Sequence, residues 1–587
     1  WVRWCYAAPA HLWAGEEILR DSEGVPRGSS AGVQQGDPLG PLLFSLALRR
    51  VTSQLRESHP DLDLSAWYLD DGTLIGPRET LIAVLRELES LGVKDLGFEL
   101  NLKKCEVWWP TGDQTFAGFP STVKRIPPCG VDILKIPVGT DAYMASYVAE
   151  KVSDMKKLME MVPLLEDLHV EYTLLRACTG AAKLTYTLRG TPPCPAVLGA
   201  LAEADKLMRR LLESQLCCSV TEEAWCQAGL RVSEGGMGLR HSQDVAHTAF
   251  LGSVLSSAEL VSRILGRPGV CVPGVPEAVA SLAGELDGEA RESVWSILDA
   301  LRQSPATADL RNECTTRPQA FFQKAVDGTL WRKLAASEMR PAHRERLEGV
   351  QRPHAGSWLS CFPNAGLGLK HSSDEFRAAA RYWLGLGSDG WDGWDGTRAL
   401  LQSGQYQVAR HDAIRDVLYH AGRTASMRPH REVHVDGSNH RPGDIYFPNW
   451  SNGMSLAVDV TVSHPSQGSP SMLASAEDNA SLRAAERAAQ AKVTKHGPRC
   501  AAQNVTFLPL AVCAFGGWLP AGEEFVDTLA GRIAEVTGVR KGVAAAQLWQ
   551  RLSLTLWRSN AQAILHYAPA ADLGTWDVPG YASGRAR

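Results

Sequence analysis

Long hydrophobic runs are missing from this sequence of 587 residues. No apolar stretch approaches the ~18 residues that a helix needs to span a bilayer, so we expect no membrane partner. Regularly paired cysteines are missing too, because the thirteen cysteines show no such spacing. In a chain of this size, that favours reduced thiols in an intracellular compartment, the nucleus or the cytoplasm.

The N-terminus carries no recognisable targeting signal. Trp1, Val2 and the residues after them include no initiator methionine, no charged leader region and no small-residue cleavage site. We therefore expect a protein that is not secreted and a chain that begins within a domain.

A strong positive charge is also lacking, since the formal net charge is −5. Proteins that bind nucleic acids usually carry a basic face, so this value argues mildly against such a partner. Net charge hides local patches, however. One stretch, 423–441, holds four arginines and three histidines: Arg423, Arg428, Arg431, Arg441, His430, His434 and His440.

The length predicts three or four domains of ~100–200 residues each. The first part of the chain mixes helix and strand patterns. We expect a helix over 39–55, with Asp37 as its N-cap and Pro38 at its first position. A hairpin over 64–75, a helix over 79–91 and a second hairpin over 98–109 complete a predicted α+β layer.

The rest of the chain is mostly helical by pattern, then contains a loop, and ends with alternating strands and helices. Residues 142–253 and 262–350 show helical patterns, and 385–396 is a loop rich in glycine and aspartate. A helix is predicted over 411–424, and 441–518 alternates strand, helix and strand. We therefore predict a multidomain α+β protein.

Two adjacent carboxylates, Asp70 and Asp71, follow a short apolar run that ends at Tyr68. Nucleotidyl transfer needs acidic oxygens that hold two Mg²⁺ or Mn²⁺ ions ~4 Å apart. Such ions prefer oxygen ligands, and a tight turn would fix both side chains. By itself, however, an Asp-Asp-Gly string is more typical of a solvated hairpin turn, so the pair alone establishes no site.

A second motif, Gly32–Pro41, lies about thirty residues earlier and opens the first predicted helix. Gly36 lets the backbone approach a base or sugar closely. Gln35 can form hydrogen bonds with a nucleotide or a template. The two motifs together favour nucleotidyl transfer over a bare turn.

These motifs resemble those of reverse transcriptases. The string Gln34–Pro41 is similar to the helix-opening motif of that family, and Tyr68–Asp71 is similar to its catalytic tetrad. Further resemblances follow in the family's order and reach residue 255 or so: Gly97, Leu100, Asn101 and 103–106, a primer-grip-like turn at 134–139, and a non-LTR thumb motif at 178–189.

The resemblance implies roles for particular residues. Asp70 and Asp71 would bind Mg²⁺ or Mn²⁺, and Lys104 would protonate the leaving pyrophosphate as a general acid. Binding of nucleotide or template would involve four residues: Gln34, Gln35, Gly36 and Tyr68. The implied partners are an RNA template, a DNA primer or target, and dNTP. We infer no protein partner.

One departure from the family concerns its first catalytic aspartate, which lies upstream of the Gln-Gln-Gly motif, on a strand. Asp21 is the sole aspartate before that motif here, and Ser22-Glu23-Gly24 after it is typical of a loop. We therefore expect that the first metal ligand is missing and that the chain does not polymerise by itself.

A second pair of carboxylates lies near the C-terminus. Asp444 precedes a strand, and fourteen residues separate it from Asp459, which lies in a strand rich in valine. Two carboxylates on neighbouring strands can bind one metal ion that activates a water for attack on a phosphodiester. A lysine usually completes such a site. Thr461 stands where an Asp-x-Lys string would place one, so Lys492 or Lys495 of the next helix is the candidate.

The alternative is that these are two strand-end aspartates on a surface sheet. In that case Asp459 would face solvent and pair with an arginine such as Arg483 or Arg487, an interaction worth ~0–1 kcal/mol. The spacing by itself favours this simpler interpretation.

The C-terminal segment resembles the restriction-like endonuclease that follows the reverse transcriptase in site-specific non-LTR retroelements. The strings Lys492–His496, Phe507–Pro509 and Phe515–Trp518 are similar to its later motifs. A Cys/His zinc knuckle usually precedes that domain. Here 396–402 lacks the expected ligands, and no cysteine lies between Cys361 and Cys500. Tetrahedral zinc needs about four N or S ligands, so we expect no zinc.

Taken together, the patterns predict a fragment of a reverse transcriptase joined to a DNA endonuclease for target-primed insertion. The alternative is a catalytically dead, nucleic-acid-binding remnant of a retroelement. We expect a partial polymerase palm at 1–140, a helical thumb at 141–260 and a helical linker at 261–410. An α/β restriction-endonuclease-like domain at 411–520 and a helical tail at 521–587 would follow.

Overall fold

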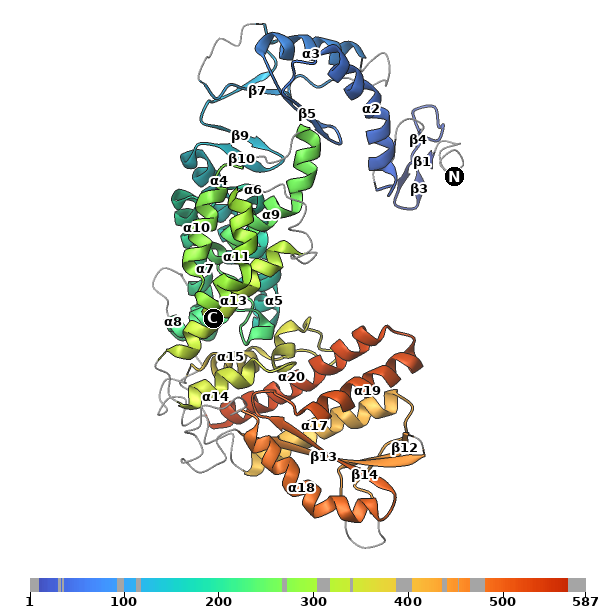
Figure 1. Ribbon diagram of the computed structural model, residues 1–587. Helices are drawn as coiled ribbons and strands as arrows, with labels where there is room; N and C mark the ends of the chain where they lie inside the picture. Colours follow the sequence, from blue (N-terminus) through green and yellow to red (C-terminus); the bar gives the residue numbers. More distant parts are fainter. Residues whose placement is uncertain are drawn as a thin grey trace, which may run out of the picture. The chain divides into compact units, whose positions relative to one another are not determined.

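The structure is a computed structural model (Figure 1) that divides the chain into two compact units. Unit 1 comprises 1–131 and 260–268, and unit 2 comprises 132–259 and 269–587. The structure describes residues 10–29, 33, 36–91, 100–111, 118–266, 272–303, 317–337, 341–386, 404–434, 441–451, 453–464 and 481–567. Gln34, Gln35, Gly97 and 396–402, where the resemblance places a zinc knuckle, lie outside these ranges.

Unit 1 has a small core between two helices. Val51 and Leu55 of α2 are buried with Val84 and Leu88 of α3, each pair four residues apart on one helix face. Its elements are β1 (Ala10–His11), β2 (Trp13–Ala14), β3 (Glu17–Ile18), β4 (Gly28–Ser29), α2 (Gly40–Ser58), β5 (Leu64–Tyr68), β6 (Asp71–Ile75), α3 (Arg78–Leu91), β7 (Glu106–Trp108) and β8 (Lys124–Ile126).

Helix α2 begins slightly later than predicted. Leu39 is its N-cap, and Pro41 rather than Pro38 occupies the first turn. Asp37 does not cap the helix; its carboxylate accepts a hydrogen bond from the backbone N–H of Leu39 at 2.8 Å. That bond closes a turn just before the helix.

The second predicted hairpin, over 98–109, is wrong for the residues that the structure describes. Strand β7 pairs in parallel with β8, in the register Glu106 to Lys124. Parallel strands need a longer connection between them than a hairpin turn provides. The alternation of side chains over 106–108 predicts a strand but does not indicate which other strand pairs with it.

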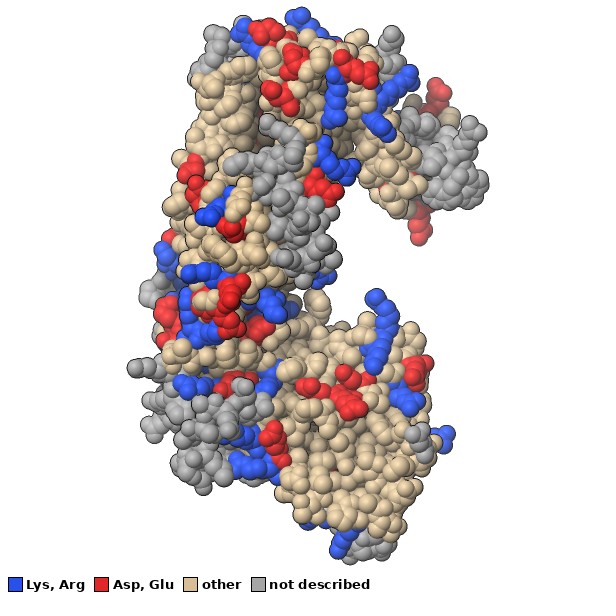
Figure 2. Space-filling model, viewed as in Figure 1, with Lys and Arg blue, Asp and Glu red and all other residues tan. Residues whose placement is uncertain are grey.

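Most of unit 2 is helical, as predicted. Its large core includes Trp358, Trp383 and Trp557, which are all fully buried. On the face seen in Figure 2, acidic and basic side chains are intermixed over the described helices. The elements between β8 and the C-terminal sheet are β9 (Gly130–Ile133), β10 (Ile136–Gly139), α4 (Asp141–Met161), η2 (Val162–Leu165), α5 (Leu168–Cys178), α6 (Ala181–Gly190), α7 (Pro195–Leu216), α8 (Glu222–Gly229), η3 (Val232–Glu234), α9 (Ser242–Leu265), α10 (Val275–Glu285), α11 (Gly288–Gln303), α13 (Pro318–Ala336), α14 (Pro341–Val350), η4 (Ala355–Ser360) and α15 (Ser373–Leu384). The first two residues of β9 and the last six of α9 belong to unit 1.

Helix α9 is long and apolar enough to cross a membrane, by length and composition only. The helix contains no long run of consecutive apolar residues, because serine, histidine and glutamine interrupt its sequence. Phe250 and Leu251 are buried in a core cluster with helices α10, α11 and α13. A buried core helix can have the same length and composition.

The C-terminal part of unit 2 contains a four-stranded sheet in the order β11-β12-β13-β14. Strands β12 and β13 pair antiparallel, and β13 and β14 pair in parallel with α18 as the crossover. The elements are α17 (Gly404–Thr424), β11 (His430–Arg431), β12 (Ile445–Ser451), β13 (Met454–Ser463), α18 (Arg483–Ala501), β14 (Val505–Cys513), α19 (Pro520–Thr537) and α20 (Lys541–Tyr567). This is the predicted alternation of strand, helix and strand.

Both faces of this sheet are covered. Ile445, Val458 and Val460 are buried in a cluster with residues of α17, α19 and α20. Ala457 belongs to the opposite cluster, with Cys500 of α18. Alternation along the strands therefore separates a large apolar face from a smaller face under α18.

The mixed α+β class is confirmed, with helices predominating. The palm, thumb and endonuclease-like assignments and their boundaries stay predictions. The stretch expected to be a helical tail packs against the sheet: Leu529 of α19 and Leu552 of α20 are fully buried in the same cluster as the strands.

Replacing Leu552 with alanine tests this shared core. We expect the sheet to lose ~2–5 kcal/mol of local stability, because the change removes a fully buried side chain. Hydrogen exchange of β13 amides, followed by mass spectrometry, measures the loss. Val543→Ala on the same helix is the control, since Val543 is 37% exposed and such changes usually cost under ~0.5 kcal/mol. Unchanged exchange in Leu552→Ala would mean that α20 is a separate tail.

Candidate metal centre

The pairing of β12 with β13 brings two aspartates together. Ile445 lies opposite Val458 in the antiparallel register, so one further step places Asp444 opposite Asp459. Directly opposed residues of an antiparallel pair share a face of the sheet. The backbone N–H of Val460 donates to Asp444 Oδ2 at 2.7 Å and holds that carboxylate against β13.

Gly443 makes this close approach possible. A Cβ at this position would lie 2.9 Å from the carbonyl oxygen of Val458, which is part of the backbone and cannot swing away. Glycine is therefore required where the chain meets β13 just before Asp444.

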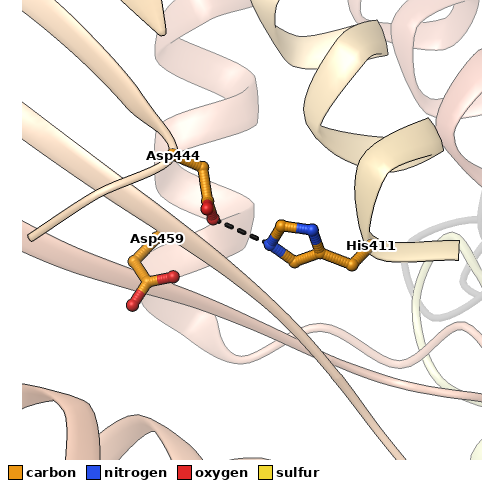
Figure 3. Close-up of side chains that lie close together, drawn as sticks. All are labelled: His411, Asp444 and Asp459. Atoms are coloured by element: carbon orange, nitrogen blue, oxygen red, sulfur yellow. Dashed lines mark hydrogen bonds and ion pairs between the residues drawn. The ribbon is translucent and has the colours of Figure 1, made fainter. Parts of the chain in front are cut away.

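His411 of α17 is the third member of the group. It lies three and seven residues before the fully buried Ile414 and Leu418, on the face of α17 that packs toward the sheet. Its Nε2 is 2.9 Å from Asp444 Oδ2 (Figure 3). One potential ligand atom each from His411, Asp444 and Asp459 lie within 4.8 Å of one another.

Lys492 reaches the same place from α18. Ala485 and Ala489 pack against β14, and Lys492 continues their helical spacing. Its ammonium donates to Asp459 Oδ1 at 2.7 Å and to the carbonyl oxygen of Val460 at 3.3 Å. Lys495, one turn further along the helix, is exposed. Of the two candidate lysines, the structure brings Lys492 to the aspartates.

Burial and charge shift the titration of the group. Burial raises the pKa of Asp459 to about 6, although Lys492 opposes this shift. Burial would also raise the pKa of Asp444, but hydrogen bonds from His411 and Val460 outweigh it and hold this pKa below its usual value. The hydrogen bond to Asp444 raises the pKa of His411.

The donors present fit a divalent metal ion. Two carboxylate oxygens and an imidazole nitrogen converge, and Asp459, only 8% exposed, is costly to ionise beside Asp444 without a cation. Lys492 supplies part of that positive charge. An ion at the same place would supply the rest.

The convergence of Asp444 and Asp459 was expected from their strands, and Asp459 pairs with Lys492 rather than with an arginine. Their metal-binding and catalytic roles stay predictions. Thr461 stands where an Asp-x-Lys string would place a lysine, and the lysine that contacts Asp459 comes from α18 instead. His411 was missed, although its place in the helical spacing of α17 could have revealed it.

The first pair of aspartates lies on the predicted hairpin of β5 and β6, but the turn comes earlier than expected. Tyr68 pairs with Asp71, which leaves Leu69 and Asp70 as the two loop residues. Leu69 has a φ of +57°, as such tight turns require. Gly72 lies within β6, where a Cβ would collide with the ring of Trp67 across the pair.

The side chains of Asp70, Asp71 and Lys104 are exposed and form no hydrogen bond or ion pair with another described residue. Tyr68 is 65% exposed. Gly36 lies in a turn with a φ of +90°. Within the described ranges, the metal-ligating group of three is His411, Asp444 and Asp459, so no third carboxylate joins Asp70 and Asp71.

Comparison with known proteins bears on the polymerase motifs. Residues 1–124 match the reverse transcriptase (RNA-dependent DNA polymerase) family. The predicted resemblance is thereby confirmed for this segment, which contains Gly36, Asp70, Asp71 and Lys104.

The chain is also similar to a retrotransposable element protein, the SLACS 132 kDa protein of Trypanosoma brucei gambiense. The two are 29% identical over 225 residues, which is 38% of this chain and 18% of that relative. The chain thus spans less than a fifth of the relative's length. Both findings support an RNA-directed DNA polymerase of a retroelement, and the endonuclease stays a prediction.

Asp459→Asn tests the electrostatics of the metal centre. The folded chain keeps the Asp459 proton up to about pH 6, whereas an unfolded aspartate releases it near pH ~4. Ionisation therefore removes stability as pH rises from about 4 to 6, by roughly 1–3 kcal/mol. The variant has no carboxyl group at this position and lacks this loss. Without metal, its free energy of unfolding minus that of the native chain should therefore be larger at pH 7.5 than at pH 4.5.

Thermal melts in EDTA at the two pH values measure the difference. The comparison at pH 4.5, where Asp459 is largely protonated, is the internal control. A variant that is relatively less stable at pH 7.5 than at pH 4.5 would contradict the raised pKa.

Proposed function

We propose that the chain is part of a retroelement protein that joins an RNA-directed DNA polymerase to a metal-dependent DNA endonuclease. The endonuclease proposal rests on one observation, the convergence of Asp444 just before β12, Asp459 in β13 and Lys492 in α18. Target-primed insertion would use both halves: the endonuclease nicks DNA, and the polymerase extends the nick on an RNA template.

Each residue of the centre has a distinct part in the proposed cleavage. Asp444 and Asp459 would hold Mg²⁺ or Mn²⁺, which supplies an activated water and neutralises phosphate charge when bound. Asp444 is oriented by the N–H of Val460, so its carboxylate needs little rearrangement. Lys492 holds a positive charge beside Asp459, which would stabilise negative charge developing on a phosphodiester.

The polymerase half is supported by the family match over 1–124 and by the retrotransposon relative. RNA template, DNA primer and dNTP are the proposed partners. Asp70 and Asp71, on an exposed hairpin turn, are the proposed metal ligands, and Lys104 is the proposed general acid. Gly36 and Tyr68 are proposed to contact nucleotide, as are Gln34 and Gln35 outside the described residues.

A catalytically dead, nucleic-acid-binding remnant remains a second candidate. It is favoured for the polymerase half by the exposure of Asp70 and Asp71 and by the lack of a third carboxylate beside them among the described residues. Asp21 does not supply one, because its carboxylate accepts hydrogen bonds from the backbone N–H groups of Glu23 and Val25 in a turn.

An intracellular location, nucleus or cytoplasm, is part of the proposal. All ten cysteines within the described ranges are free thiols, which supports a reducing compartment.

Lys492→Ala should lower metal-dependent nicking of supercoiled plasmid DNA by ~10²–10³-fold, the usual effect of removing a preorganised charge from a transition state. Gel analysis of plasmid nicking over time measures the rate. Lys495→Ala, on the same helix but exposed, should nick at the native rate. Equal rates for both variants would exclude Lys492 from the reaction, and nicking that survives Asp459→Asn would place the activity elsewhere.

We expect no primer extension by this chain on an RNA template with Mg²⁺ or Mn²⁺. The reason is that the described residues bring two carboxylates, not three, to the hairpin of β5 and β6. Incorporation of labelled dNTP into a primer is the measurement. Extension that disappears in Asp70→Ala would show that another acid completes the polymerase site.

A further inference from the structure

We propose that His411 is a third metal ligand and that it makes the centre select a first-row transition ion such as Mn²⁺ over Mg²⁺. This inference rests on the proposed function, because it concerns the same centre. It goes further by assigning a ligand outside the two strands and a class of metal.

The geometry points to a ligand rather than a chance neighbour. The Nε2 of His411 lies 2.9 Å from Asp444, on the oxygen that also accepts from Val460. Nitrogen and carboxylate oxygens of the three residues lie within 4.8 Å of one another, so a single ion can reach all three. In Figure 3 the ring projects from its helix toward Asp444, with Asp459 on the neighbouring strand.

The other ring nitrogen supplies an independent observation. Nδ1 lies 3.1 Å from Asp412, and Arg415 donates to the same carboxylate oxygen at 2.8 Å. A metal-bound histidine almost always donates its second ring N–H to a carboxylate or carbonyl, which fixes the ring and directs the free nitrogen at the ion. Asp412 and Arg415 form such a support on the same helix.

An imidazole ligand changes which ion binds best. Mg²⁺ is a hard ion that favours oxygen ligands and retains its waters. First-row transition ions accept imidazole nitrogen readily, and Mn²⁺ accepts both nitrogen and carboxylate oxygen. A set of two carboxylates and one imidazole therefore favours Mn²⁺ over Mg²⁺, whereas the two carboxylates alone would suit either ion.

Replacement of His411 by glutamine separates this role from a hydrogen-bonding one. The glutamine amide N–H can still donate to Asp444, while its oxygen replaces nitrogen as the atom offered to a metal. We expect the Kd for Mn²⁺ to rise by ~10-fold or more, while the Kd for Mg²⁺ changes by less than about 3-fold. The preference for Mn²⁺ over Mg²⁺ should fall accordingly.

The measurement is the signal of free Mn²⁺ in electron paramagnetic resonance, titrated with the full chain and then displaced by Mg²⁺. His420→Gln is the matched control, because His420 is an exposed histidine of the same helix, nine residues on and facing the opposite way. It should bind both ions as the native chain does. Circular dichroism without metal confirms that each variant is folded.

The outcomes distinguish the inference from the function on which it rests. Loss of the Mn²⁺ preference in His411→Gln, with binding abolished in Asp459→Asn, supports both. An unchanged preference in His411→Gln, with binding still lost in Asp459→Asn, overturns the ligand role and leaves the metal centre intact. Mn²⁺ binding that survives Asp459→Asn overturns the centre itself.

Discussion

Two carboxylates on neighbouring strands repel each other, and the rest of the candidate centre is arranged around that repulsion. The register of β12 against β13 puts Asp444 and Asp459 side by side, and burial strengthens their interaction. Each is therefore held by a different group: Asp459 by the ammonium of Lys492, and Asp444 by His411 and a backbone N–H. These contacts let the pair exist, and a metal ion would complete the neutralisation.

The position of His411 depends on packing well away from the strands. Arg410, its neighbour in α17, is buried and donates to Asn560 of α20 at 2.7 Å. Asn560 in turn donates to the carbonyl of Ala514, just after β14. Helix α20 also packs on both large cores of unit 2, through Leu552 on one side and Trp557 on the other. The C-terminal helix thus helps to position the histidine side of the centre.

The two candidate sites differ in what supports them. The polymerase motifs are supported by a family match over 1–124, yet Asp70 and Asp71 lie exposed on a hairpin without a third ligand among the described residues. The side chains of the C-terminal centre, by contrast, converge and are partly buried. A polymerase site is completed around its nucleic acid and nucleotide, whereas the C-terminal centre is assembled by the sheet and its two flanking helices.

The sequence by itself determined the elements whose cause is local. Alternation predicted the hairpin of β5 and β6, helical spacing predicted α3, and a valine-rich run predicted β13 with Asp459 inside it. It could not determine which strands pair, because pairing depends on contacts between residues far apart in the chain. Strand β7 pairs in parallel with β8, whereas the local pattern favours a hairpin.

The same division holds within the candidate centre. The strand pattern made Asp444 and Asp459 candidates, because each lies at or in a recognisable strand, but their spacing by itself favoured two surface aspartates, and the resemblance to the endonuclease supplied the rest. Choosing Lys492 over Lys495, and adding His411, required the tertiary structure. A helix turns by about 100° per residue, so a small rotation decides which side chain faces the sheet, and that rotation is set by how α17 and α18 pack.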